Sequence, residues 1–306
     1  MKIFLAGGTG MVGRNFLEHA SASGRDISAP SRAELDLLDG EAVRSALSAS
    51  KPDIVVHAAG LVGGIQANMA RQSSFLDENL RMGRNLLLAA RAAGVPRFLN
   101  IGSGCMYPRS APNPIREDSL LTGEPEPTNE GFALAKIAVA RLSAYLSRED
   151  ASFSCKTLVP CGLYGRWDNF SPERSHLVPA VLRKLHLAAK EAAPEIDIWG
   201  DGKAVREFMY AGDMAALLHR AVEEFDSLPS LMNAGPGTGV SVDEVYAAAA
   251  AAVGYKGSFR HDLSKPSGMP AKVLDVSGMR KWGWTPSTGL SEGLSLAYSF
   301  FRESAL

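Results

Sequence analysis

Three glycines near the N-terminus constrain the fold more than any other feature of this chain. They follow a short apolar stretch at residues 3–6, and a helical pattern begins just after them. A glycine turn between a strand and a helix lets backbone amides approach a pyrophosphate and lets the helix pack on the strand. A purely structural turn is the alternative. We predict a dinucleotide-binding βαβ unit, in which the phosphates contact Gly7, Gly10, Met11, Val12 and Gly13.

The residues after the second predicted strand, at 26–29, indicate which dinucleotide binds. An acidic residue at this place would favour NAD by binding the ribose 2′-hydroxyl. Ser31 and Arg32 stand there instead, and they offer a hydroxyl and a guanidinium suited to a 2′-phosphate. The sequence therefore predicts NADP(H), although Arg32 on its own could be a solvated loop charge.

Residues 51–60 predict a third strand, buried and parallel, with His57 in the core. Small residues at its end, Ala58, Ala59 and Gly60, would let a cofactor lie across the carboxyl edge of the sheet. With strands 3–6 and 154–159 and a long helix at 75–93, the pattern predicts an α/β fold. We expect a Rossmann-type, doubly wound parallel sheet with a smaller C-terminal α/β lobe for the substrate.

The length of 306 residues fits two lobes rather than one core. We expect a nucleotide-binding domain from residues 1–163 plus about 209–240, and a substrate lobe from about 164–208 plus 241–306. A net charge of −1 favours neither nucleic acid nor a membrane surface as partner. No apolar run is long enough to span a membrane, no signal peptide is evident, and the three cysteines lack metal-like spacing. These features predict a cytoplasmic protein without a bound metal.

Two further segments carry groups suited to proton transfer. Ser103 and Cys105 follow a predicted strand, and Phe132 stands four residues before Lys136 on a predicted helix at 131–148. Residues four apart share one face of a helix. Taken alone, that pair could be no more than an amphipathic face.

Together these segments resemble the active site of the extended short-chain dehydrogenases/reductases, in which a Tyr-x-x-x-Lys pair follows a Ser/Thr. The resemblance narrows to the GDP-L-fucose synthase family, NADPH-dependent epimerases and reductases of GDP-4-keto-6-deoxy-mannose, and it covers essentially the whole chain. It is carried by motifs such as Val62-Gly-Gly-Ile-x-Ala-Asn68, Glu126-Pro-Thr-Asn-Glu130, Ser175-His176, Asp168-Asn-Phe, Trp199-Gly200, Arg206-Glu-Phe208 and Ser264-Lys-Pro-x-Gly268.

The resemblance implies a two-stage reaction. Cys105 and His176 would exchange protons at C3 and C5, next to the C4 ketone, before hydride arrives at C4. Ser103 would hydrogen-bond the keto oxygen, and Lys136 would hold the nicotinamide ribose. Phe132 occupies the position of the catalytic tyrosine and has no hydroxyl. We therefore expect impaired reduction, since a lost general acid slows a reaction by roughly 10²–10⁴-fold.

The resemblance also implies the remaining contacts. Further cofactor contacts would come from Asp36, Leu37, Ala58, Ala59, Gly60, Asn79, Lys136, Pro160, Leu163 and His176. Substrate contacts would come from Ser103, Gly104, Gly162, Lys184, Trp199, Arg206 and Lys272. Among these, the three cations suit a diphosphate, and Trp199 would stack on or pack beside the guanine or the sugar.

Several pocket positions depart from the family pattern. Leu61 and Ala271 replace basic residues, Lys184 replaces an arginine, and Gly104 replaces a serine. Gly162 replaces an asparagine, and the smaller residue would make room in the pocket. Two alternatives therefore stay open. One is a C4 reductase of another nucleotide-linked keto sugar, such as a GDP-keto-heptose, and the other is a noncatalytic NADP-binding module. Helices at about 71–93 and 131–148 are expected to pair two subunits into a homodimer.

Overall fold

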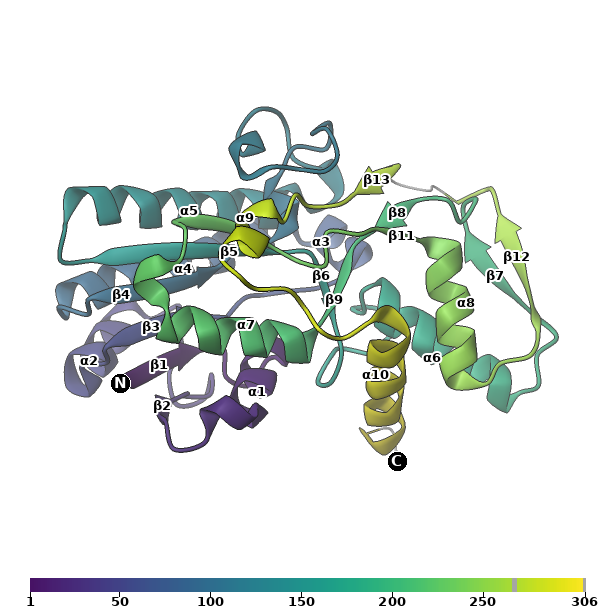
Figure 1. Ribbon diagram of the computed structural model, residues 1–306, viewed down its shortest axis with the longest axis horizontal. Coiled ribbons are helices and arrows are strands. Elements are labelled where there is room, and N and C mark those ends of the chain that lie inside the picture. The colour runs from purple at the N-terminus through teal and green to yellow at the C-terminus, as the bar shows by residue number, and fades with distance from the viewer. Residues whose placement is uncertain (266–268, 305–306) are drawn as a thin grey trace.

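A six-stranded parallel sheet forms the centre of the larger part of the molecule (Figure 1). The computed structural model describes residues 1–265 and 269–304. The strand order is β10-β5-β4-β3-β1-β2, with every neighbouring pair parallel. The strands are β1 (Lys2–Ala6), β2 (Asp26–Ser28), β3 (Ile54–His57), β4 (Arg97–Ile101), β5 (Ser154–Pro160) and β10 (Leu231–Ala234). The predicted Rossmann-type fold is confirmed.

The side chains of alternate residues in each strand point to opposite faces of this sheet. Ile3 and Leu5 of β1 pack into one buried cluster, whereas Phe4 and Ala6 pack into another. Helices α1 (Met11–Glu18) and α7 (Ala211–Glu223) cover the first face, while α2 (Gly40–Ser50) and α4 (Gln72–Ala92) cover the second. Both faces are therefore apolar, which explains the nearly continuous hydrophobic strands. His57 lies in β3 and is buried, as predicted.

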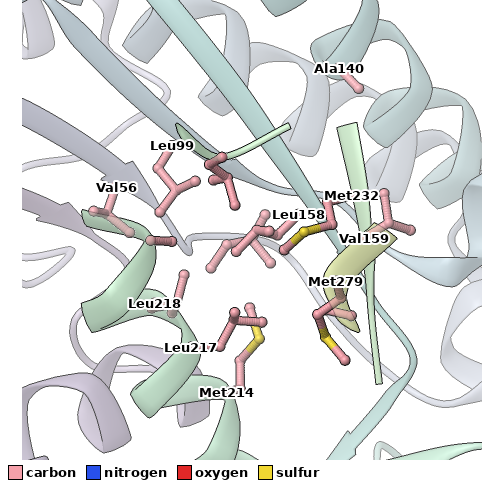
Figure 2. Packing of buried hydrophobic residues seen from close by; sticks show 14 of the residues in the cluster. Val56, Leu99, Ala140, Leu158, Val159, Met214, Leu217, Leu218, Met232 and Met279 are labelled. Atoms are coloured by element: carbon pink, nitrogen blue, oxygen red, sulfur yellow. The ribbon is translucent and has the colours of Figure 1, made fainter. Parts of the chain in front are cut away.

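Figure 2 shows how α7 packs on the sheet. Met214, Leu217 and Leu218 project from this helix toward Leu158 and Val159 of β5, and all five side chains are buried. A helix that presents residues three and four apart to a sheet buries one continuous stripe. These buried contacts hold α7 on the sheet. There α7 also packs against α1, the helix that begins at the predicted dinucleotide site.

Helix α5 (Glu130–Glu149) packs closely along α4. The approach depends on Gly83, because a β-carbon built there would lie 2.5 Å from Cγ2 of Val139. Gly131 at the start of α5 has the same effect, since its β-carbon would lie 2.3 Å from the carbonyl oxygen of Gln72. The two helices that were expected to pair subunits therefore also form one closely packed layer within the chain.

A third buried cluster forms the core of the smaller part of the molecule. It includes Tyr164, residues of α6 (Leu177–Lys190) and α8 (Val242–Val253), and Leu294 and Ala297 of α10 (Leu290–Ser304). Strand β7 (Glu195–Trp199) pairs with β12 (Ser258–Asp262) beside these helices. The short strands are β6 (Gly162–Tyr164), β8 (Val205–Arg206), β9 (Phe208–Tyr210), β11 (Val240–Ser241) and β13 (Ala271–Lys272).

The chain returns to the larger core before it ends. Leu274, Val276 and Met279 pack with the sheet residues, and α9 (Ser277–Lys281) lies against β10. The proposed division into lobes stays a prediction, but the segment 274–284 belongs spatially with the nucleotide-binding side. Residues 266–268 of the motif that ends at Gly268 lie outside the described residues.

The remaining elements are one short helix and five single turns: α3 (Ile65–Ala70), η1 (Ala20–Ala22), η2 (Gly104–Met106), η3 (Glu117–Ser119), η4 (Pro127–Asn129) and η5 (Phe225–Ser227). Within the described ranges, no helix combines the length and the apolar character needed to cross a bilayer.

Candidate active site

The glycine turn has the geometry expected of a phosphate site. Gly7 has φ of +89°, and a β-carbon there would lie 2.5 Å from the backbone nitrogen of Ala59. At Gly13 it would lie 2.2 Å from the Gly7 carbonyl oxygen. At Gly10, in contrast, the nearest atom would be 3.5 Å away, and no side chain caps α1. Two glycines are thus needed for packing, and the first amides of α1 remain available for an anion.

The residues predicted to bind the adenosine lie just after β2. Arg32 is exposed, and the backbone amide of Ser31 donates to Oε2 of Glu34 at 2.8 Å. Asp36 accepts a hydrogen bond from the backbone of Leu38 at 3.0 Å, and Leu37 packs partly on the core. An exposed guanidinium at this turn is compatible with a ribose 2′-phosphate.

Lys136 reaches across the carboxyl edge of the sheet. Its Nζ donates to the carbonyl oxygen of Ile101 at 2.9 Å and would lie 3.9 Å from a β-carbon built at Gly60. Burial lowers its pKa to about 8. Asn79 holds the neighbouring segment, because its amide donates to the carbonyl of Leu61 at 3.1 Å and its Oδ1 accepts from the Leu61 amide at 2.9 Å. Asn79 thus shapes this edge through the backbone.

Phe132 lies one turn before Lys136 with its ring nearly buried. The lysine Nζ is 5.8 Å from the ring centroid, and the Phe75 ring meets that of Phe132 edge-on at 6.4 Å. The helical face that the sequence predicts is therefore formed. At this place it presents a phenyl ring where a phenol would be needed to donate a proton.

Ser103 and Cys105 stand where β4 ends. The Ser103 hydroxyl oxygen accepts from the Cys105 backbone amide at 3.2 Å, which fixes the turn η2 and leaves the hydroxyl proton free to donate. The Cys105 thiol is partly exposed. Its sulfur accepts a hydrogen bond from Nδ2 of Asn129 at 3.1 Å.

His176 enters from the smaller part of the molecule as the first residue before α6. The loop that carries it lies against the segment after β3: the Gly64 amide donates to the carbonyl of Arg174 at 3.0 Å. His176 is exposed at the surface, yet desolvation by the surrounding protein lowers its pKa. The imidazole is therefore neutral near pH 7 and can accept a proton.

Two predicted substrate contacts differ in the space around them. A β-carbon at Gly104 would lie 3.7 Å from Cε of Lys272, an ordinary contact, so the lysine stem borders the Ser103–Cys105 turn. A β-carbon at Gly162 would lie 3.0 Å from Cδ1 of Phe208. The expectation that Gly162 makes room is therefore wrong on this side, because the Phe208 ring fills the space.

Two of the other predicted substrate residues bind carbonyl groups of the protein itself. Lys184 donates to the carbonyl of Asp197, and it lines a surface pocket of about 410 Å³ together with Arg183 and Ser175. Arg206 donates to the carbonyl of Met269 at 2.7 Å, and burial lowers its pKa. The Trp199 ring, in contrast, is 56% exposed at the end of β7.

Two buried carboxyl groups were not singled out from the sequence as site residues. Burial raises the pKa of Asp168 to about 7, and its Oδ2 has no hydrogen-bond partner among the described residues. Burial also raises the pKa of Glu207 to about 7, although this carboxylate accepts from the amides of Leu274 and Gly237, each at 2.7 Å. Both residues lie inside quoted motifs, but nothing local signals their burial.

Comparison with known proteins places this geometry in context. Residues 3–235 match the NAD dependent epimerase/dehydratase family. The chain is 44% identical over 301 residues to a GDP-L-colitose synthase from Yersinia pseudotuberculosis, covering 98% of each chain. It is 42% identical to a GDP-L-fucose synthase from Azorhizobium caulinodans, covering 98% of this chain and 96% of the other. A solved GDP-mannoheptose C4 reductase from Campylobacter jejuni with NADP bound superposes with a TM-score of 0.89 at 29% identity, covering 98% of each chain.

Proposed function

Because the chain belongs to the NAD dependent epimerase/dehydratase family, we propose that it acts on a GDP-linked 4-keto-6-deoxy sugar, exchanging protons at C3 and C5 and reducing C4. It is an NADP-dependent oxidoreductase/epimerase of nucleotide sugars, as the full-length similarity to GDP-L-colitose and GDP-L-fucose synthases supports. The observation that carries the proposal is the convergence of Ser103, Cys105 and Lys136 at the ends of β3 and β4.

The proton chemistry is assigned to two side chains that approach from different parts of the fold. Cys105 lies at the end of β4, and the neutral His176 precedes α6. A base that removes a proton next to a ketone sends the C–H electron pair toward the keto oxygen, and an acid on the opposite face returns a proton. Ser103 can donate to that oxygen, so the enolate charge is stabilised as it forms.

Phe132 is expected to slow the reduction step. Bound NADPH supplies the hydride, and the C4 oxygen must then receive a proton. Ser103 is the hydroxyl near this position, whereas Phe132 offers only carbon atoms to the space beside Lys136. We therefore infer that proton exchange proceeds and that reduction is slow by roughly 10²–10⁴-fold.

A second candidate reaction is C4 reduction of another GDP-linked keto sugar. The observation in its favour is the space around Gly104, where a side chain would meet only ordinary contacts at 3.4 Å or more. Gly104 itself is buried, so this space is that of one small side chain; what the glycine changes is the loss of a serine hydroxyl that could have bonded the sugar. The structural likeness to a GDP-mannoheptose C4 reductase agrees with this alternative.

The test is NMR in D₂O with GDP-4-keto-6-deoxy-mannose and NADPH, comparing the protein with Phe132→Tyr. Deuterium should enter C3 and C5 with both proteins, and only the variant should reduce C4 at a substantial rate. Cys105→Ser serves as the control that loses exchange. If neither protein exchanges nor reduces this sugar, the assignment fails, and GDP-keto-heptoses become the substrates to test.

The subunit is proposed to form a homodimer through α4 and α5. Apolar side chains on the outer surface of these helices support this assembly: Leu88 is 37%, Leu134 39% and Tyr145 50% exposed. Because α4 and α5 pack on each other, a second copy that binds one of these helices would lie next to the other.

A further inference from the structure

The side chain of Asn129 contacts the proposed acid/base Cys105 directly. Its Nδ2 lies 3.1 Å from the cysteine sulfur. An amide nitrogen can only donate, so the sulfur must be the acceptor in this contact. A thiolate accepts hydrogen bonds better than a thiol, so the contact favours the form of cysteine that can remove a proton.

The usual role of an asparagine at this position is taken by another residue. Asn129 is the N-cap of α5, where an asparagine normally accepts from the first backbone amides of the helix. It makes no such bond. Instead, Oε1 of Gln72 in α4 accepts from the Gly131 amide at 2.8 Å, and its Nε2 donates to the carbonyl of Pro127 at 2.7 Å. The start of α5 is thus capped from α4, which leaves the Asn129 amide for Cys105.

The oxygen of the same side-chain amide, Oδ1 of Asn129, has no hydrogen-bond partner in the described part of the chain. Among the described residues, Oδ1 of Asn129 is buried and accepts no hydrogen bond. Leaving a buried acceptor unpaired costs about 1–3 kcal/mol, and such costs are concentrated at functional sites. The sulfur contact is therefore the feature that accounts for an asparagine here.

We propose that Asn129 is a positioning residue that holds Cys105 and stabilises its thiolate, so that the sulfur can take a proton from the carbon next to the substrate ketone. The C–H electron pair moves toward the keto oxygen, and the proton taken up by sulfur is then lost to solvent. The carbon receives a different proton on its opposite face, from His176 after the imidazole has taken up a proton from solvent. The proton-transfer part of this inference rests on the proposed function, whereas the stabilised thiolate does not.

The test measures the alkylation of Cys105 by iodoacetamide as a function of pH, with mass spectrometry to separate its peptide from those of Cys155 and Cys161. In Asn129→Ala the reaction should need a higher pH, and its rate near pH 7 should fall about tenfold, as expected for a lost hydrogen bond to a charged group. Asn129→Asp should shift the profile further, because a carboxylate repels the thiolate. Deuterium exchange into the keto sugar should slow by a similar factor with little change in KM.

Gln72→Ala is the matched control. It loosens the same helix start but keeps the Asn129 amide, so it should lower stability and retain the alkylation profile of the parent. If both Asn129 variants alkylate like the parent, or if Gln72→Ala shifts the profile equally, the proposal is overturned. If the alkylation shift appears but no protein exchanges deuterium into the sugar, the proposed epimerisation fails and the Asn129 contact stands.

Discussion

Lys136 keeps an ammonium group in the interior of the protein, where, within residues 1–265 and 269–304, it donates one hydrogen bond, to the Ile101 carbonyl. Burial lowers its pKa from 10.5 to about 8. Below about pH 8 both the folded and the unfolded chain carry the proton, and the full cost of burying the charge is present. Between pH 8 and 10.5 the unfolded chain binds a proton that the folded chain has lost, so the free energy of unfolding rises with pH.

Lys136→Met should therefore raise the free energy of unfolding of the cofactor-free protein by at most about 3 kcal/mol near pH 7. The gain over the parent should shrink as the pH increases from 8 to 10.5, and the variant should bind NADPH more weakly. Denaturant unfolding at several pH values measures this difference. The exposed Lys281→Met is the control, and a gain that grows with pH would refute the argument.

For single residues, the sequence predicted which side chains are suited to the reaction, but it did not predict which neighbours those side chains contact. The chemical suitability of Cys105 and His176 for proton exchange could be inferred from side-chain type. The bond from Lys184 to Asp197 could not, because it depends on how β7 lies beside α6. The filled space beside Gly162 depends likewise on Phe208 from a different strand.

At the scale of helices and strands, the close packing of α4 against α5 can be tested by substitution at their contact. Gly83→Ala places a methyl group 2.5 Å from Cγ2 of Val139, so it should destabilise the protein by about 1–3 kcal/mol. Val139→Ala should remove most of that penalty in the double variant, because the two side chains compete for one space. Thermal unfolding of the single and double variants measures the coupling, and additive losses would contradict this packing.

The long elements were predictable because their apolar periods are strong. Residues 154–159 and 131–148 were expected as strand and helix, and β5 and α5 include them. The short strands β8, β11 and β13 were not predicted, because two-residue pairings are fixed by tertiary contacts rather than by local pattern. For the same reason, the return of residues 274–284 to the larger core could not be foreseen.

At the scale of the whole molecule, the proposed dimer has a direct test. Leu134→Arg places a charge on the exposed face of α5, and it should convert the dimer to monomer because an unpaired charge is costly in an apolar interface. Light scattering after size-exclusion chromatography measures the mass. Leu296→Arg, on the exposed surface of α10, is the control that should leave the dimer intact. A parent that is itself monomeric would contradict the proposal.

The core of the smaller part joins Tyr164, near the middle of the chain, to Leu294 and Ala297, near its C-terminus. A contact between residues so far apart in sequence carries a large loop-closure cost, and it can form only after the C-terminal residues have been made. During synthesis, the strands of the large sheet can leave the ribosome and pair before α10 exists. A growing chain can therefore complete its nucleotide-binding sheet while the side of the protein that carries His176 still lacks its last supporting helix.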